Sequence, residues 1–293
     1  MNASDRLIQA IGKTGNPTAM GLDTQISHLP EEFLAAGAEN NAQRSAAILR
    51  YNAALLELMQ GIIPCVKVQV AYYEQLGLQG MFTFAQTLRM ARAQGYVTIA
   101  DVKRNDIGAT SEAYARAYLT PGADFEADFV TVNGYLGVDG IKPFTDLCAE
   151  YEKGLYILVK TSNPSSGQLQ DKKIGRKTVY ETMAGLVMEW GAGLVGECGY
   201  SSIGAVVGAT YPEQGTALRA RMAQTPFLVP GYGAQGAGGA ELKGCFDADG
   251  KGAVVNASRS LLAAHKKAEG TPWRDAVMAE AVRMRGDIMG ALS

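Results

Sequence analysis

The feature of this chain that most limits its fold is the repeated pairing of a short apolar stretch with a helical one. Apolar and β-branched stretches of strand length recur along the whole sequence, at residues 18–22, 65–70, 96–100, 129–132, 155–159, 203–207, 227–229 and 253–255. Helical stretches separate or follow them, at residues 42–62, 111–119, 178–190, 213–223, 258–268 and 275–292. Strands that alternate with helices indicate parallel βα units.

A closed (β/α)₈ barrel, the TIM barrel, is the simplest architecture for eight such units. An open, doubly wound parallel sheet is the alternative. The length of 293 residues suits one barrel, and no linker rich in Pro, Gly or Ser divides the chain. We therefore expect residues 1–293 to form a single barrel domain.

Composition excludes several classes of protein. Hydrophobic residues make up 47% of the chain and charged residues 19%, and the net charge is −2. This balance is that of an ordinary globular chain, and it provides no basic surface for nucleic acid or an anionic membrane. Neither a signal peptide nor an apolar run of membrane-spanning length is present. We expect a cytoplasmic protein that binds neither nucleic acid nor a membrane.

Cysteine and histidine usage points the same way and argues against a metal site. The four cysteines are scattered without a CxxC pair, which predicts buried free thiols in a reducing compartment. Only two histidines occur, His28 and His265, and they have neither HxH nor HExxH spacing. We expect no metal site, and we place neither histidine in the functional site.

The segment 100–110, ADVKRNDIGAT, places acidic and basic residues together at the end of a predicted strand. Asp101 follows a predicted strand, and Lys103 lies two residues on, so both side chains are expected on the same side. Asp106 comes three residues later, which predicts a lysine bracketed by two carboxylates. Nearby negative charge keeps an ammonium protonated, so Lys103 would be a poor nucleophile and a well-placed acid. The alternative is a solvated cluster of surface charges.

Other polar residues also fall at or near the carboxyl ends of predicted strands: Asp23, Lys67, Asn133, Lys160, Gly208 and Asn256. The carboxyl-terminal face is the catalytic face of a barrel. Lys67 stands inside an apolar strand, where a buried ammonium requires a carboxylate partner, and Asp101 on the next strand is the natural one. The alternative for Lys67 is an edge-strand lysine, although a closed barrel has no edge.

Two consecutive loops near the carboxyl end of the chain have features of an anion site. The segment 230–239, PGYGAQGAGG, is dense in glycine and includes Gln235, and such loops let backbone N–H groups approach an anion. The segment 255–261, VNASRSL, runs from a strand into a helix start and carries Arg259. These positions are the usual phosphate site of a barrel, although a glycine-rich loop alone also suits a simple turn.

The segment 160–168, KTSNPSSGQ, follows the fifth predicted strand. Thr161, Ser162 and Asn163 have the hydrogen-bonding groups to bind the amide edge of a heterocycle. The long polar stretch 165–177 is suited to a lid. A helix cap followed by a turn explains Ser-Asn-Pro equally well.

Taken together, these segments resemble the orotidine 5′-phosphate decarboxylase family, in its longer bacterial-type subgroup. The chain contains GLD at 21–23, VKVQVAYYEQLG with Lys67, DVKRNDIGAT, KTSNP, PGYGAQG and NASR in the family's order. The pattern DxKRxDIGxT is the most specific of them. The resemblance implies a phosphate-binding (β/α)₈ barrel, usually a homodimer with shared active sites.

The resemblance also implies roles for individual residues. Lys67, Asp101, Lys103 and Asp106 match the family's alternating lysine and aspartate network, and Asp106, Ile107 and Thr110 would reach the neighbouring subunit's site. The remaining matches are the substrate ligands: Asp23 with Lys67 for ribose, Ser162 for the pyrimidine, and Gln235 and Arg259 for the phosphate. The segment 165–177 departs from the compact form of the family.

The implied reaction is decarboxylation of orotidine 5′-monophosphate to uridine 5′-monophosphate, with no metal ion and no organic cofactor. Loss of CO₂ leaves a carbanion that the ring π system cannot delocalise, and a fixed ammonium is the physical means of stabilising it. One alternative is a metal-dependent sugar-phosphate aldolase or synthase on the same type of barrel. The other is a barrel that only binds a nucleotide.

Overall fold

The computed structural model describes residues 1–35, 37–233 and 238–293 of the chain. Its central sheet is a closed barrel of eight parallel strands in the order β1-β10-β9-β8-β5-β4-β3-β2. These strands are β1 (Thr18–Leu22), β2 (Cys65–Gln69), β3 (Val97–Arg104), β4 (Phe129–Val132), β5 (Gly154–Lys160), β8 (Ile203–Val207), β9 (Phe227–Pro230) and β10 (Ala253–Ala257). Pairing between β1 and β10 closes the ring, which confirms the barrel and excludes the open sheet.

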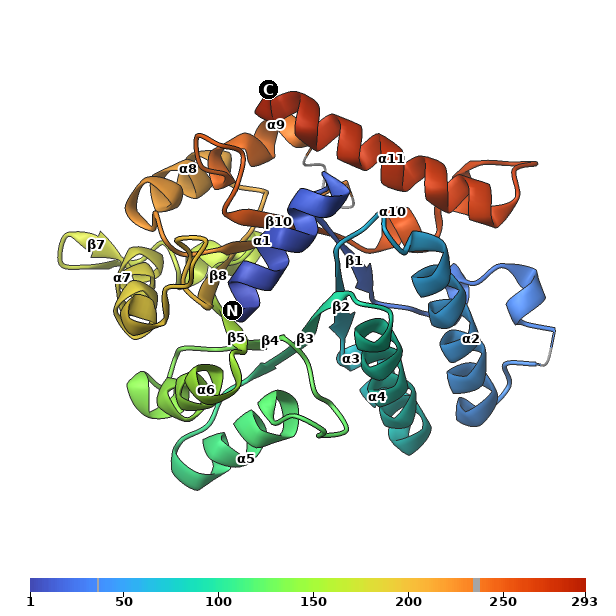
Figure 1. Cartoon of the computed structure of the whole chain (residues 1–293), viewed down its shortest axis with the longest axis horizontal. Coiled ribbons are helices and arrows are strands. Elements are labelled where there is room, and N and C mark those ends of the chain that lie inside the picture. Colours follow the sequence, from blue (N-terminus) through green and yellow to red (C-terminus); the bar gives the residue numbers. More distant parts are fainter. Residues whose placement is uncertain (36, 234–237) are drawn as a thin grey trace.

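Helices cover the outside of the barrel, as Figure 1 shows. The longer ones are α2 (Asn41–Met59), α4 (Gly77–Ala93), α5 (Gly108–Leu119), α6 (Val138–Tyr151), α7 (Val179–Gly191), α8 (Pro212–Arg221) and α11 (Trp273–Leu292). Short α-helices are α3 (Ala71–Glu74), α9 (Gly239–Leu242) and α10 (Arg259–Leu262). The 3-10 turns are η1 (Ile26–His28), η2 (Glu31–Phe33), η3 (Pro164–Gln168), η4 (Ala192–Leu194), η5 (Lys243–Cys245) and η6 (Ala264–Lys267).

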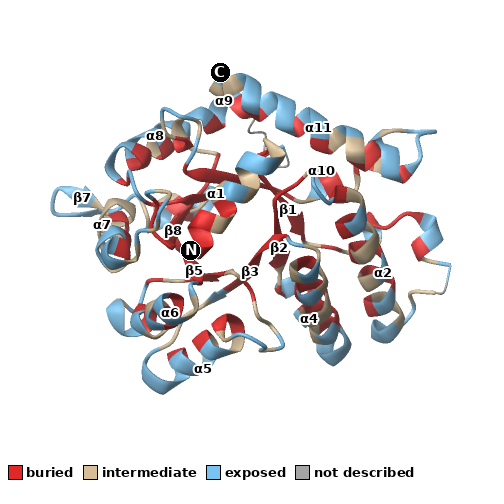
Figure 2. Ribbon diagram, in the orientation of Figure 1, coloured by how far each residue is buried: buried red, intermediate tan, exposed pale blue. Residues whose placement is uncertain are grey.

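The barrel has two hydrophobic cores. One lies between the strands and the surrounding helices, whose inward faces are buried and outward faces exposed in Figure 2. The other fills the barrel interior, where Phe129 and Tyr156 stack with their ring centroids 4.9 Å apart. This inner core also contains Ala3 and Leu7 of α1 (Ala3–Thr14), which lies across the amino-terminal end of the barrel. The opposite end is therefore the one left open for a site.

Replacing Leu7 with alanine is expected to destabilise the fold by about 2–5 kcal/mol, because it leaves a cavity under the barrel floor. Leu7 is buried in the inner core at the amino-terminal end of the barrel, opposite the polar strand ends. The free energy of unfolding in urea measures the loss. KM for the substrate should stay within about twofold, with exposed Leu78→Ala as the matched control. A change in KM that corresponds to a larger free energy than the loss of stability would contradict this assignment.

Several expected boundaries differ from the structure. The strand predicted at 96–100 continues as β3 to Arg104, because a register shift lets Arg104 pair with Val132 after an irregular turn. The helix predicted at 258–268 is instead the four-residue α10 followed by η6. The polar stretch 165–177 contains η3 and a small antiparallel pair, β6 (Lys173–Ile174) with β7 (Lys177–Thr178).

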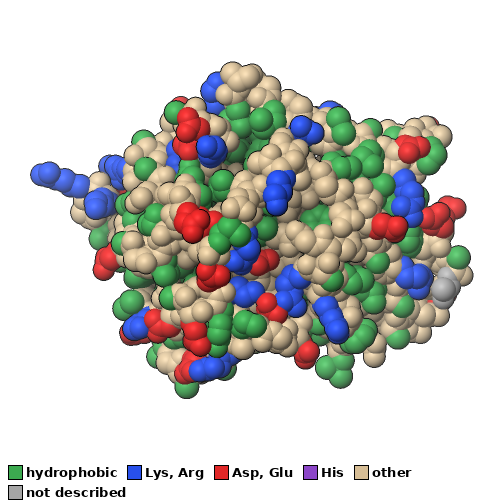
Figure 3. All heavy atoms as spheres, in the orientation of Figure 1, with side chains coloured by type: hydrophobic (Ala, Val, Ile, Leu, Met, Phe, Trp, Pro, Cys, Tyr) green, Lys and Arg blue, Asp and Glu red, His purple; other side chains and the backbone are tan. Residues whose placement is uncertain are grey.

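The surface of the described residues fits the charge balance of the sequence. On the face shown in Figure 3, basic and acidic side chains are interspersed. Within the described ranges, the helices are all too short or too polar to cross a membrane. All four cysteines are free thiols, and Cys65, Cys148 and Cys245 are buried.

Candidate active site

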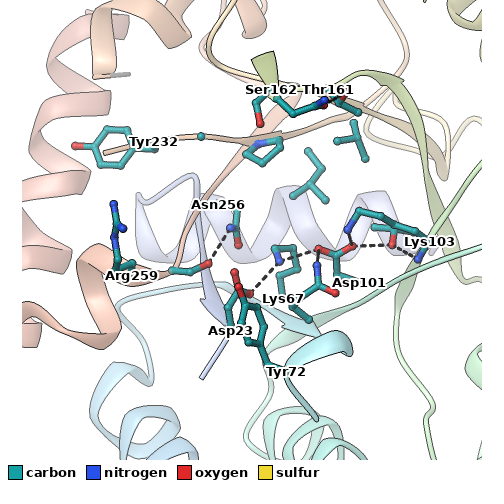
Figure 4. Close-up of a pocket in the computed structure, with 18 of the residues that line it drawn as sticks. Asp23, Lys67, Tyr72, Asp101, Lys103, Thr161, Ser162, Tyr232, Asn256 and Arg259 are labelled. Carbon is teal, nitrogen blue, oxygen red and sulfur yellow. Dashed lines mark hydrogen bonds and ion pairs between the residues drawn. The ribbon is translucent and has the colours of Figure 1, made fainter. Parts of the chain in front are cut away.

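A cavity of about 720 Å³ opens at the carboxyl-terminal ends of the barrel strands. This volume lies in the range of small-molecule sites, and the cavity has an apolar floor with polar groups around it. The floor includes Leu158, Val206 and Leu228. Polar lining residues come from strand ends all round the barrel: Asp23, Lys67, Gln69, Asp101, Lys103, Thr131, Thr161, Ser162, Asn163, Asn256, Ser258 and Arg259. Figure 4 shows the charged cluster on one side and Arg259 with Tyr232 on the other.

Asp101 is the centre of the charged cluster. One carboxylate oxygen accepts from Lys67 Nζ at 2.9 Å and Gln69 Nε2 at 2.8 Å. The other accepts from Lys103 Nζ at 2.6 Å and Thr131 Oγ1 at 2.9 Å. Burial alone would raise the pKa of Asp101, but the two ammonium groups and their hydrogen bonds lower it well below the usual carboxyl range. Asp101 is therefore a charged carboxylate, and each of its oxygens accepts two hydrogen bonds from the protein.

Lys67 lies deepest in this cluster, and its side chain is only 5% exposed. Its ammonium also contacts Asp23 Oδ1 at 3.3 Å. Burial works against the charged form, yet Asp101 and Asp23 outweigh it and raise the pKa of Lys67. This ion pair confirms the predicted pairing of Lys67 with Asp101 on the neighbouring strand. The strand register explains it, because Gln69 and Asp101 are register partners and Lys67 lies two residues before Gln69 on the same face.

Lys103 stands at the mouth of the cavity, and its side chain is 45% exposed. Its backbone has φ = 47°, a left-handed conformation that is unusual for a residue other than glycine. Thr131 holds this turn, because its hydroxyl accepts from the N–H groups of both Val102 and Lys103 while donating to Asp101. Such local strain persists only where the surroundings fix it, and it aims a half-exposed ammonium into the cavity.

Asp106 does not bracket Lys103 within one chain, contrary to the sequence prediction. The left-handed turn at Lys103 and the register shift carry the chain away from the cavity, and α5 then begins at Gly108. The Asp106 carboxylate instead accepts from the N–H of Ile107 at 2.9 Å. Ile107 and Thr110 are exposed on the outer surface, and none of these three residues lines the cavity.

The far end of the cavity is formed by the loops after β9 and β10. Gly231, Tyr232, Ser258 and Arg259 line it, and Asn256 Nδ2 donates to Ser258 Oγ at 3.2 Å. The Asn256 side chain is buried, and its amide oxygen has no hydrogen-bond partner among the described residues. The predicted phosphate ligand Arg259 lines this end of the cavity, whereas the other, Gln235, lies outside the described residues.

The loop after β5 contributes a third wall through Thr161, Ser162 and Asn163. The side-chain amide of Gln170 holds this loop, accepting from Thr161 N at 2.9 Å and donating to Thr161 Oγ1 at 2.7 Å. Gly208 lies directly behind it, because a Cβ there would meet the Ser162 backbone at 2.7 Å. The position of Ser162 is therefore fixed from two sides.

Lys160 is one of the strand-end residues predicted at the catalytic face, but it does not line the cavity. Its ammonium is fully buried and binds Asp171 Oδ1 at 2.7 Å and Ser166 Oγ at 3.1 Å. It also lies 4.5 Å from the centroid of the Tyr211 ring. Lys160 thus anchors the polar stretch that begins at Ser165. Asn133 is likewise structural, accepting from the N–H of Tyr135.

Sequence reasoning missed several residues of the site. His28 lines the cavity, so the expectation that neither histidine belongs to the site is wrong for His28. Gln69 and Thr131 orient Asp101, and Tyr72 and Tyr232 lie in the wall. Gln69 was available to sequence reasoning, because it lies two residues after Lys67 on the same strand face. In the part of the chain that the structure describes, no three His, Cys, Asp or Glu side chains are grouped to hold a metal ion.

The closed barrel and its lysine–aspartate cluster define a (β/α)₈-barrel enzyme with its site at the carboxyl ends of the strands. The family model described as "Orotidine 5′-phosphate decarboxylase / HUMPS family" matches residues 46–271. The chain belongs to this family.

Individual relatives agree with the family match. The chain is 40% identical over 301 residues to the orotidine 5′-phosphate decarboxylase of Rhodopirellula baltica, covering 99% of this chain and 100% of the relative. It is 42% identical to the enzyme of that name from Clostridium novyi over 266 residues, 90% of each chain. A crystal structure from Streptomyces avermitilis, provisionally given the same name, superposes with a TM-score of 0.82 at 31% identity, covering 99% of this chain and 96% of that one. The alternative of a metal-dependent sugar-phosphate aldolase is not supported by these comparisons.

Proposed function

We propose that this protein is a carboxy-lyase that converts orotidine 5′-monophosphate to uridine 5′-monophosphate and CO₂, the last step of pyrimidine nucleotide synthesis. The observation that carries the proposal is the line of charges Lys67, Asp101 and Lys103 at one side of the cavity, with Lys103 at its mouth. Burying such a network only to bind a ligand is costly, so its charges are better explained by chemistry.

Lys103 is the proposed acid. When the bond between C6 and the carboxylate breaks, CO₂ leaves and the electron pair remains on C6. An ammonium already fixed by Asp101 at 2.6 Å needs no reorganisation to stabilise that charge. One N–H of Lys103 then passes its proton to C6, and solvent returns a proton to the lysine. Lys67 keeps Asp101 ionised from its other side.

The other side chains are proposed to bind the substrate. Asp23 and Lys67 meet the ribose hydroxyls, and Ser162 meets the pyrimidine edge from the loop that Gln170 holds. Arg259 and Gln235 bind the phosphate. Binding energy from this remote end favours a closed, water-poor site around C6, with the stretch 165–177 as its lid.

The test of the proposed reaction is a choice of substrates under metal-free conditions. Purified protein in EDTA should decarboxylate orotidine 5′-monophosphate and leave a pentulose or hexulose phosphate with formaldehyde unchanged. A metal-dependent synthase would instead act on the sugar phosphate once divalent metal is restored, and it would leave orotidine 5′-monophosphate unchanged.

Replacing Arg259 with alanine is expected to lower kcat/KM by roughly tenfold or more, because a hydrogen-bonded charge on the phosphate is lost. Arg259 lies at the end of the cavity away from Lys103. Most of the loss should appear in KM. Arg259→Lys keeps the charge without the bidentate geometry, so its kcat/KM should lie between the values of the wild type and of Arg259→Ala. An unchanged kcat/KM would remove Arg259 from the phosphate site.

We also propose that the protein acts in the cytoplasm as a homodimer with shared sites. Four free cysteines suit a reducing compartment.

The dimer is supported by large apolar side chains that are exposed close to Asp106 in the sequence or structure: Ile107, Tyr135, Leu136 and Val138. The Cβ position of Gly140, on the same α6 as Val138, is 2.8 Å from the Asp106 carbonyl oxygen. Exposed apolar side chains around Asp106 favour a second copy of the chain on this face, which would bring its Asp106 to Lys103.

Mixing two inactive variants tests the shared site. Lys103→Ala and Asp106→Ala should each be nearly inactive as pure dimers. After denaturation and refolding together, half of the dimers would be hybrids, each with one intact site. Activity should therefore return to about a quarter of the wild-type value by random pairing. No recovery, with hybrids demonstrated by mass, would show that Asp106 acts within its own chain, and an active Asp106→Ala dimer would show that Asp106 is not needed.

A further inference from the structure

His28 is an unassigned group in the wall of the cavity. It ends η1, in the loop that follows β1, and it is only 8% exposed. Asp23, at the end of β1, and Arg259, at the start of α10, line the same cavity. Asp23 and Arg259 both lie near enough to act on the charge of His28, so His28 belongs to the same part of the wall as a proposed ribose ligand and a proposed phosphate ligand.

The hydrogen bonding of the imidazole fixes which nitrogen carries its proton. His28 Nδ1 accepts from the backbone N–H of Gln25 at 3.4 Å. An imidazole nitrogen that accepts cannot carry the proton in the neutral ring, so the proton is on Nε2. Among the described residues, Nε2 has no hydrogen-bond partner. The loop thus presents an N–H donor from a ring that borders the cavity.

Burial and the nearby basic groups favour the neutral form of His28 in the free protein. Burial lowers its pKa, as do Lys266 and His265 of η6 and Arg259 of α10, while Asp23 acts in the opposite direction. A ligand phosphate placed beside Arg259 would reverse this balance, because it adds two negative charges next to three cationic or basic groups.

We infer that His28 is a substrate-binding residue for the phosphate group, to which it donates its Nε2–H beside Arg259. The inference rests on the proposed function, and it deepens the assignment of that end of the cavity. It requires that binding of a phosphate-bearing nucleotide, and not of the nucleoside, changes the titration of His28.

The chain allows a direct measurement, because it has only two histidines. The pKa values of both imidazoles are followed by NMR in the wild-type protein, free and saturated with uridine 5′-monophosphate or with uridine. His28→Gln identifies the His28 signal by removing it. With the nucleotide, the pKa of His28 should rise by about one pH unit or more. With uridine it should stay unchanged, and His265, which does not line the cavity, should shift less in both.

Kinetics provides an independent readout. His28→Leu should raise KM by roughly tenfold through loss of one hydrogen bond to a charged group, with a smaller change in kcat. His28→Gln keeps an N–H donor and should recover most of the affinity. The KM ratio between His28→Leu and wild type should also grow as the pH falls, because only the imidazole gains a charge.

An unchanged His28 pKa in a protein that demonstrably binds the nucleotide would overturn the inference while leaving the proposed function intact. An equal rise with uridine would overturn the assignment to the phosphate. Failure of the wild-type protein to bind uridine 5′-monophosphate at all would instead overturn the proposed function, and the inference with it.

Discussion

Replacing Lys103 with alanine is expected to abolish turnover, with a loss of at least about 100-fold in kcat, because a positioned acid contributes roughly 10²–10⁴-fold. The fold should survive, since the Lys103 side chain is nearly half exposed and its removal leaves no buried cavity. The melting temperature and the affinity for uridine 5′-monophosphate measure fold and binding separately from turnover.

Lys103→Arg is the matched control for this prediction. Arginine keeps a positive charge for Asp101, but at neutral pH it does not release a proton. If proton delivery is the role of Lys103, the arginine variant should bind nucleotide and remain nearly inactive. Retention of more than about a tenth of the wild-type rate by Lys103→Ala would exclude Lys103 as the acid.

Asp101→Asn is expected to destabilise the protein by about 3–5 kcal/mol and also to remove most activity. The substitution preserves shape but leaves the Lys67 ammonium buried beside a neutral amide, with only Asp23 at 3.3 Å to compensate. Urea unfolding measures the loss of stability. Asp146→Asn is the matched control, because Asp146 pairs with Lys142 on the exposed surface of α6, where about 0–1 kcal/mol is expected.

The pH dependence of this stability has a definite sign. The pKa of Asp101 is lower in the folded protein than in the unfolded chain, so its contribution is present at neutral pH. That contribution decreases as the pH falls through the ordinary carboxyl range toward the lower folded pKa. The stability difference between wild type and Asp101→Asn should therefore shrink in acid. A difference that stays constant from neutral pH to pH 3 would contradict the ion-pair account.

The barrel and the inner half of the charged cluster could be predicted from sequence because both follow from strand periodicity. Alternation within β2 and β3 places Lys67 and Asp101 on one face, and parallel register brings them together. Helices α4 and α6 were not predicted, since Gly77 and Gly80 in the first and Pro143 in the second are residues that usually weaken helices.

The rest of the site depends on loop geometry, which periodicity does not describe. The left-handed turn at Lys103 sends Asp106 to the surface, and no pattern in DVKRND indicates it. Lys160 is anchored by Asp171 across an irregular loop, so its position in the strand suggested the wrong role. His28 reaches the cavity from a 3-10 turn whose sequence resembles any polar loop.

The most direct test of the account is the product formed by the metal-stripped wild-type protein from orotidine 5′-monophosphate. The absorbance change of the pyrimidine ring is followed in EDTA, and CO₂ and uridine 5′-monophosphate are quantified. The account predicts equal amounts of both products over many turnovers, with none from Lys103→Ala in the same buffer. A folded wild-type protein that binds the nucleotide and forms no CO₂ would contradict it.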